Sequence, residues 1–169
     1  MEEKTCSCTS HRPQSLSFSF NEKGKRCLRL KETLRETVEK LIKEKRVTHF
    51  ISGMALGVDT WFAETVLELR DTVFPQISLE AAIPCETQAE KWNEAQRNRY
   101  FGIIARCDKE TLLQTHYTED CMQKCNRYLV DHCDYLLAVW NGSSSGTGST
   151  VEYAREQNKN IICINPKPF

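Results

Sequence analysis

The most constraining stretch of the chain is residues 49–63, which read HFISGMALGVDTWFA. A short apolar run stops at Ser52 and Gly53, three residues lead to Gly57, and an amphipathic segment follows. This order predicts a strand, a glycine-containing turn and a helix. Glycine lets the backbone approach a ligand closely, and the first turn of a helix offers unpaired N–H groups to a phosphate. Asp59 falls in that turn, as a helix cap or as a ligand for a ribose hydroxyl. A tight turn that binds nothing has the same pattern.

The rest of the chain alternates in the same way between short apolar runs and amphipathic segments. Residues 135–140 (YLLAVW) are continuously apolar, which is typical of a strand buried on both faces of a parallel sheet. Strands alternating with helices predict a three-layer, doubly wound α/β sheet, mostly parallel, with helices on both faces. We expect one domain spanning residues 1–169. The expected strands are 4–9, 47–51, 77–83, 110–114, 135–140 and 161–164, and the expected helices are 25–45, 58–70, one or two within 86–106, 119–132 and 149–157.

Charge and hydropathy exclude several classes of protein. The 23 basic and 23 acidic residues cancel, so a broad DNA-binding surface is not expected and nucleic acid is not an expected partner. The sequence has no run of 18 apolar residues and no basic-then-apolar leader, so neither a membrane partner nor secretion is expected.

The nine cysteines are odd in number and lie mostly in expected strands and helices, so we expect reduced thiols in a cytoplasmic protein. Zinc is the alternative interpretation, because Cys121 and Cys125 share a helix face and His116, His132 and Cys133 lie near them in sequence. Without a Cys-x-x-Cys pair, no metal is expected.

In a doubly wound sheet, ligands bind outside the carboxyl ends of the strands. The second glycine-rich turn, residues 141–150, lacks the lysine of a Walker A loop but offers hydroxyls and N–H groups to a phosphate or a ribose. Arg12 is the candidate phosphate cation. Trp61 and Trp92 have the alternatives of stacking on a base or packing in the core. The candidate ligand-binding residues are Ser10, His11, Arg12, Ser52, Gly53, Met54, Ala55, Gly57, Asp59, Gly146, Thr147, Gly148, Ser149, Thr150 and Glu152.

Several motifs in order resemble the SLOG superfamily, and within it the YpsA-type branch. They read SHRP, SGMALGVDTWFAE, IPCETQAEKW, NRYLVDHCDYLLAVWNG and SGTGSTVEYA. The resemblance implies a Rossmann-like fold, a nucleotide-type ligand with no further cofactor, and a homo-oligomer. Through it, Gly53, Gly57 and Asp59 match the first ligand turn, and Gly146, Thr147 and Glu152 match a Gly-Thr-x-x-Glu region. Asn126 and Arg127 match a polar pair of the branch, as a ligand contact or a subunit contact.

Two departures from the family pattern guide the choice of function. Ser10 stands where the first motif usually has glycine, and Glu152 follows Thr147 at a spacing of five positions where three are usual. The favoured hypothesis is a sensor or sequestering protein for a nucleotide or an NAD-derived ligand such as ADP-ribose. The alternative is an enzyme that cleaves an N-glycosidic bond, with Glu152 or Asp59 as the catalytic candidates. A DNA-processing role is the third hypothesis, and the charge balance argues against it.

Overall fold

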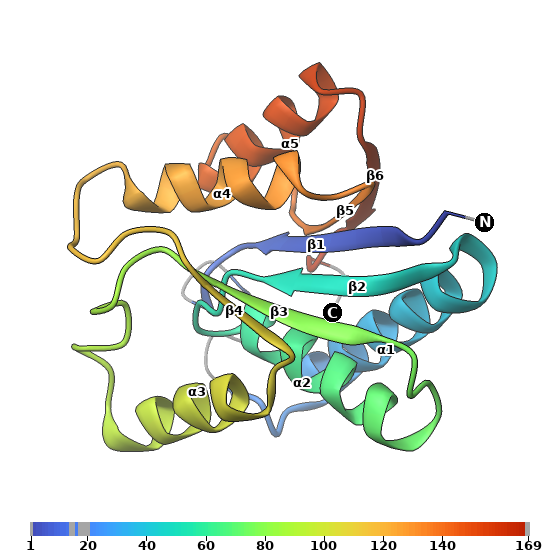
Figure 1. Cartoon of the computed structure of the whole chain (residues 1–169), viewed down its shortest axis with the longest axis horizontal. Helices are drawn as coiled ribbons and strands as arrows, with labels where there is room; N and C mark the ends of the chain where they lie inside the picture. Colours follow the sequence, from blue (N-terminus) through green and yellow to red (C-terminus); the bar gives the residue numbers. More distant parts are fainter. Residues whose placement is uncertain (1, 14–15, 17–20, 168–169) are drawn as a thin grey trace.

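The computed structural model describes residues 2–13, 16 and 21–167, which form one six-stranded sheet with helices on both faces (Figure 1). Every strand pairing is parallel, where the sequence predicted a mostly parallel sheet. The strands are β1 (Lys4–Ser10), β2 (Val47–Ser52), β3 (Ser78–Ile83), β4 (Lys109–Leu112), β5 (Tyr135–Val139) and β6 (Asn160–Ile164), and the helices are α1 (Lys25–Lys45), α2 (Val58–Thr72), α3 (Glu94–Arg106), α4 (Cys121–Asp131) and α5 (Gly146–Glu156).

The strand order β4-β3-β2-β1-β5-β6 places a switch point between β1 and β5. From β1 the chain runs outward to β4, with α1, α2 and α3 on one face of the sheet. Helix α4 then carries it back across the other face to β5, and α5 leads to β6 (Figure 1). In such a sheet, the crevice at the carboxyl ends of the two strands that flank the switch point is where ligands bind.

Strand β5 confirms the prediction from its apolar run. Leu137 packs into the apolar core beneath α1 and α2, whereas its neighbours Leu136 and Ala138 pack with residues of α5 on the opposite face. Alternate side chains of a strand point to opposite faces, so an uninterrupted apolar run is buried on both sides. This strand fixes the centre of the three layers.

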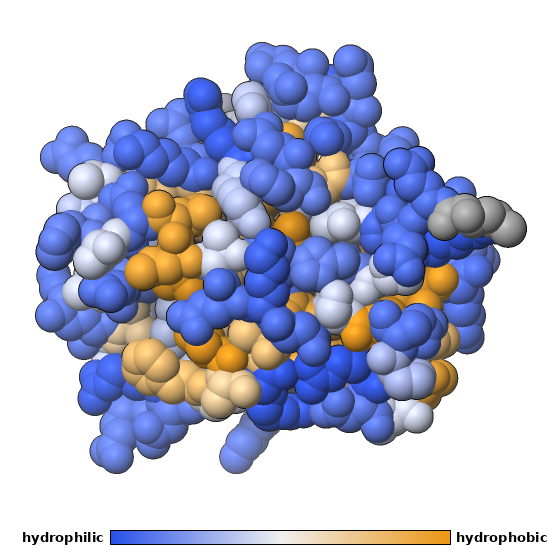
Figure 2. Space-filling view, viewed as in Figure 1, coloured by the Kyte–Doolittle hydropathy of each residue, from blue (hydrophilic) through white to orange (hydrophobic). Residues whose placement is uncertain are grey.

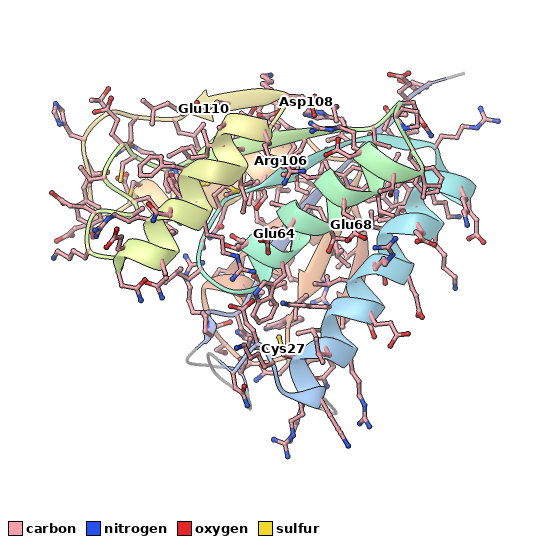
Figure 3. The ribbon with its side chains drawn as sticks, turned by 90° about the horizontal axis from the view of Figure 1, so that it is seen from below. Cys27, Glu64, Glu68, Arg106, Asp108 and Glu110 are labelled. Carbon is pink, nitrogen blue, oxygen red and sulfur yellow. The ribbon has the colours of Figure 1, made fainter. Side chains whose placement is uncertain are left out.

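The helices beneath the sheet are tied to one another at their outer edges. Glu68 of α2 accepts a hydrogen bond from Arg35 of α1 at 2.7 Å, and Glu64 of α2 pairs with Arg99 of α3 (Figure 3). Partly exposed ion pairs contribute only up to about 1 kcal/mol each. The apolar face of α1, which is buried at the helical spacing that the sequence shows, therefore contributes more to holding this layer.

Helix α5 begins three residues earlier than predicted. Glycines at 146 and 148 argue against a helix by propensity. The Ser145 side chain, however, accepts a hydrogen bond from the Gly148 N–H at 3.1 Å and caps the first turn. The Gly146-Thr147-Gly148 segment is therefore the first turn of a helix and not part of the preceding loop, which changes where its N–H groups point.

Residues 86–92 form turns and not a first helix, and α3 begins at Glu94. Its start is fixed by a capping box, in which the Asn93 side chain accepts from the Gln96 N–H and the Gln96 side chain accepts from the Asn93 N–H. Strand β4 begins one residue earlier and ends two residues earlier than predicted. The other element boundaries agree with the prediction to within two residues.

Candidate functional site

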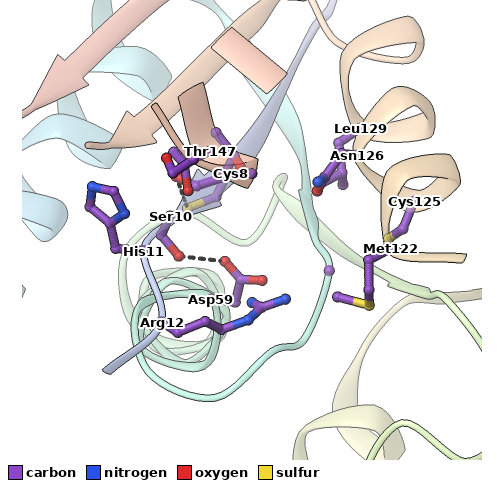
Figure 4. Close-up of a pocket in the computed structure, with 14 residues that line it drawn as sticks. Cys8, Ser10, His11, Arg12, Asp59, Met122, Cys125, Asn126, Leu129 and Thr147 are labelled. Carbon is purple, nitrogen blue, oxygen red and sulfur yellow. Dashed lines mark hydrogen bonds between the residues drawn. The ribbon is translucent and has the colours of Figure 1, made fainter. Parts of the chain in front are cut away.

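A hollow of about 250 Å³ opens at the switch point, above the ends of β1 and β2 and between α4 and the start of α5 (Figure 4). We call it the central hollow. Seven of the expected residues line it, and the remaining lining residues come from β1, α4 and the cap of α5. The expected ones are Ser10, His11, Arg12, Gly53, Asp59, Gly146 and Thr147, and the others are Cys8, Thr9, Met122, Cys125, Asn126, Leu129 and Ser145.

Asp59 forms the floor of the central hollow. Its Oδ1 accepts a hydrogen bond from Ser10 Oγ at 2.9 Å, and its Oδ2 accepts one from the Ala55 N–H at 3.2 Å (Figure 4). Burial raises the pKa of this carboxyl, and the positive charge of Arg12 and the two hydrogen bonds oppose that rise. Both oxygens therefore already serve the protein, and Asp59 joins the end of β1 to the turn after β2.

The polar groups of the turn after β2 mostly bond to the turn itself. Ser52 Oγ donates to the Asp59 carbonyl at 2.9 Å and accepts from the Met54 N–H at 3.1 Å. Met54 is fully buried and has a φ of 59°, a conformation uncommon for a residue with a side chain. Ser52, Met54 and Ala55 therefore shape the turn and do not line the central hollow.

The two glycines of that turn have different roles. Gly57 has a φ of 87°, and a Cβ there would lie 2.8 Å from Pro13 Cγ, so it permits the turn and its packing against the chain after β1. Gly53 lines the central hollow, where a Cβ would lie 3.4 Å from Asp59 Oδ2 and 3.6 Å from Cys125 Sγ. Only Gly53 leaves space that a ligand can use.

The start of α5 forms the opposite wall. Gly146 and Thr147 line the central hollow, and their N–H groups belong to the first turn of a helix, where no carbonyl of the same helix accepts them. The positive end of the helix dipole adds to their attraction for an anion. Gly148 instead allows close packing, because a Cβ there would lie 2.7 Å from the Ser143 carbonyl oxygen.

Arg12 supplies the cation at the mouth of the central hollow. It is exposed, its side chain extends alongside Asp59 (Figure 4), and within the described part of the chain it makes no hydrogen bond or ion pair. His11, by contrast, is buried, and its Nε2 lies 3.1 Å from the Asn141 backbone N and 3.0 Å from Asn141 Oδ1. His11 therefore ties the end of β1 to the end of β5, while Arg12 is available to a ligand.

Glu152 is placed away from the central hollow. Its side chain is 64% exposed and lies 3.6 Å from Arg155 on the outer surface of α5. Because α5 begins at Gly146, Glu152 falls almost two turns inside the helix. Ser149 and Thr150 face a separate hollow between α4 and α5, and the Thr150 hydroxyl donates to the Gly146 carbonyl.

The wall formed by α4 is the part of the site that the sequence least revealed. Met122, Cys125, Asn126 and Leu129 follow the i, i+3, i+4, i+7 spacing of one helix face, a spacing that is equally typical of a face packed in the core. Burial raises the pKa of Cys125 to about 12, so it presents a neutral thiol and no nucleophile. Most of this wall is apolar, so apart from Asn126 the polar contacts come from the other sides of the hollow.

Two further properties bear on the class of protein. Among the described residues, no group of three or more His, Cys, Asp or Glu is placed to hold a metal ion, and all nine cysteines are free. No helix in the described ranges has the length and apolar content needed to cross a bilayer.

The family model YpsA, described as the YspA SLOG family, matches residues 6–167 of this chain. The chain belongs to that family. A UPF0398 protein of Brevibacillus brevis is 31% identical over 130 residues, which cover 76% of this chain and 68% of the relative. The UPF0398 protein YpsA of Bacillus subtilis is 26% identical over 160 residues, covering 91% of this chain and 87% of the relative.

Solved structures support the same fold. DNA processing protein A from Helicobacter pylori, studied for its single-stranded DNA binding mode, superimposes with a TM-score of 0.61 at 15% identity over 96% of this chain and 65% of that one. The DprA of Streptococcus pneumoniae gives a TM-score of 0.62 at 15% identity over 96% of this chain and 50% of that one. These likenesses extend to the Rossmann-like SLOG fold, and this chain spans only part of each DprA chain.

Proposed function

We propose that the central hollow binds the phosphate of a nucleotide or of an NAD-derived ligand such as ADP-ribose, and that the protein acts as a sensor or sequestering module. The observation that carries the proposal is the convergence of the Arg12 guanidinium and the first turn of α5 on one hollow at the switch point. A guanidinium and helix N–H groups together match the charge and geometry of a phosphate. The hydroxyl of Thr147, which lines the same hollow, adds a further donor.

Binding is better supported than hydrolysis of a glycosidic bond. A water-activating carboxylate must reach the reacting atoms and have an oxygen free to accept a proton. Glu152 pairs with Arg155 at the surface, and both oxygens of Asp59 accept hydrogen bonds from the protein. The Cys125 thiol, with its raised pKa, is no substitute. A DNA-processing role has no comparable support, because the charges of the chain cancel.

The test is a thermal-shift measurement with AMP, ADP, ADP-ribose, cyclic ADP-ribose and NAD, followed by chromatography of the recovered ligand. A ligand at 100 times its dissociation constant stabilises the folded protein by about 2.7 kcal/mol. We expect a shift with intact ligand from the wild type and from Arg26→Gln, which changes an exposed arginine of α1 that does not line the central hollow, and a much smaller shift from Arg12→Gln.

Equal shifts in the two arginine variants would refute the phosphate site. Release of a free base would show that the protein is an enzyme and would refute the sensor function. Glu152→Gln then separates the two functions further, because a binding module keeps its full affinity when this exposed carboxylate is neutralised.

A further inference from the structure

The central hollow has two neighbouring hollows that share lining residues with it. The larger of these two neighbours, of about 720 Å³, shares Arg12 and Met122 with it, and the smaller neighbour, of about 320 Å³, lies between α4 and α5 and shares Met122, Asn126 and Gly146. We call them the large hollow and the small hollow. Because the same side chains line neighbouring hollows, a ligand that fills the central one is in contact with the entrances of both others.

The walls of the large hollow are suited to a planar ring. Tyr117 is 65% exposed, a large aromatic surface that the fold does not use, and Trp92 stands edge-on to Tyr100 with centroids 5.2 Å apart. Leu56 and Met122 add apolar surface, and Figure 2 shows apolar residues gathered between α4 and α3 on this side of the molecule. Aromatic side chains can stack on any nucleobase, because every base has a π-face.

The rim of the large hollow can also recognise a base edge. Gln88 lines it, and its amide nitrogen lies 3.3 Å from the Gly53 carbonyl oxygen and 3.4 Å from Tyr100 OH. Its amide oxygen makes no hydrogen bond within the described part of the chain. A largely apolar hollow with a few convergent polar groups is typical of a small-molecule site.

The small hollow has different chemistry. Arg127 lies over the ring of Tyr153, with the guanidinium carbon 5.2 Å from the centroid, and Ser149 and Asn126 add a hydroxyl and an amide. The Tyr153 hydroxyl donates to Asp131 at 2.7 Å, which fixes the ring. A cation and neutral polar groups around a fixed ring suit a sugar or a second phosphate better than an apolar group.

We propose that the ligand spans all three hollows and is a nucleoside diphosphate that carries a second sugar-like group. The base stacks in the large hollow on Tyr117 and Trp92, the phosphates lie in the central hollow, and the second group reaches Arg127 in the small hollow. This assignment rests on the proposed function and adds to it an orientation and a minimum ligand size.

Isothermal titration with AMP, ADP-ribose and ribose 5-phosphate tests the assignment on the wild type and on two variants, Tyr117→Ala and Arg127→Gln. The control variant is Leu28→Ala, which truncates an apolar residue of α1 that is 53% exposed. We expect ADP-ribose to bind more tightly than AMP. Tyr117→Ala should weaken both by about tenfold, the scale of one lost stacking contact, and leave ribose 5-phosphate unchanged. Arg127→Gln should weaken ADP-ribose alone, and Leu28→Ala should change nothing.

The outcomes separate the two proposals. If AMP binds through Arg12 but ADP-ribose gains nothing and Arg127→Gln has no effect, the spanning ligand is refuted and the phosphate site stands. If Tyr117→Ala leaves AMP binding unchanged, the base does not lie in the large hollow. If no nucleotide binds, both proposals are wrong. A short single-stranded oligonucleotide that binds more tightly than every free nucleotide would overturn the small-molecule assignment.

Discussion

Glu80 is a buried carboxylate in β3 whose surroundings predict a measurable effect on stability. Its side chain accepts hydrogen bonds from His49 Nε2 at 2.8 Å, from Thr111 Oγ1 at 2.8 Å and from the hydroxyl of Tyr128, and Lys109 Nζ lies 3.8 Å away. Burial alone would raise the pKa, but these groups outweigh it and lower the pKa from 4.5 to about 2. The network joins β2, β3, β4 and α4.

Replacing Glu80 with glutamine removes the charge and keeps the shape. A pKa that is lower in the folded state than in the unfolded state contributes stability above the unfolded value, and that contribution is lost as the pH falls through the folded value. A shift from 4.5 to about 2 corresponds to about 3 kcal/mol at neutral pH. We therefore expect Glu80→Gln to lower the free energy of unfolding by that order at pH 7 and by less than half as much at pH 3.

Urea unfolding followed by circular dichroism at both pH values measures the difference. Glu110→Gln, on the exposed edge strand β4 (Figure 3), is the matched control and should change little. A loss below about 1 kcal/mol at pH 7, or an equal loss at pH 7 and pH 3, would refute the reasoning. Because Tyr128 packs with Cys125 and Leu129, which line the central hollow, the same substitution should also weaken ligand binding.

Three further perturbations test the site. Gly53→Ala should fold normally and weaken phosphate binding in titrations, because its Cβ enters the central hollow at ordinary contact distances. Gly53→Asp should also lower the melting temperature, because it places a second carboxylate close to Asp59. Asp59→Asn should tighten the binding of an anionic ligand and raise the melting temperature at neutral pH, because it removes a buried negative charge from a carboxyl whose pKa is raised by burial. Weaker binding would instead favour a direct contact between Asp59 and a ribose hydroxyl. Mass spectrometry after brief iodoacetamide treatment at pH 8 should find exposed Cys163 modified and buried Cys125 unmodified until the protein unfolds.

The order of the strands along the chain was predictable because it depends on local patterns. The apolar run at 135–140 predicted a fully buried strand, and Leu136 and Leu137 do pack on opposite faces. The start of α5 was not predictable from propensity, because two glycines in its first turn are offset by one cap from Ser145. A side-chain contact of this kind outweighs the average preference of a residue type.

The sequence predicted that several candidate residues lie together at one edge of the sheet, but not how each side chain is placed there. Ser10, Arg12, Gly53 and Gly146 do line the central hollow. The α4 wall was missed, because a helix face that lines a hollow has the same spacing as one that packs in the core. Glu152 was placed by its spacing in a motif, and spacing alone could not show that the helix turns it toward Arg155.

The turn at residues 52–59 organises the site without supplying most of its ligand contacts. Its polar groups bond to one another, and Asp59 would repel a phosphate at its own helix N-terminus. The start of α5 has no acidic residue in its first turn, so its dipole is uncompensated there. Arg12 is attracted by Asp59 on one side and is open to a ligand anion on the other. A phosphate is therefore expected to bind on the α5 side, away from the buried carboxylate.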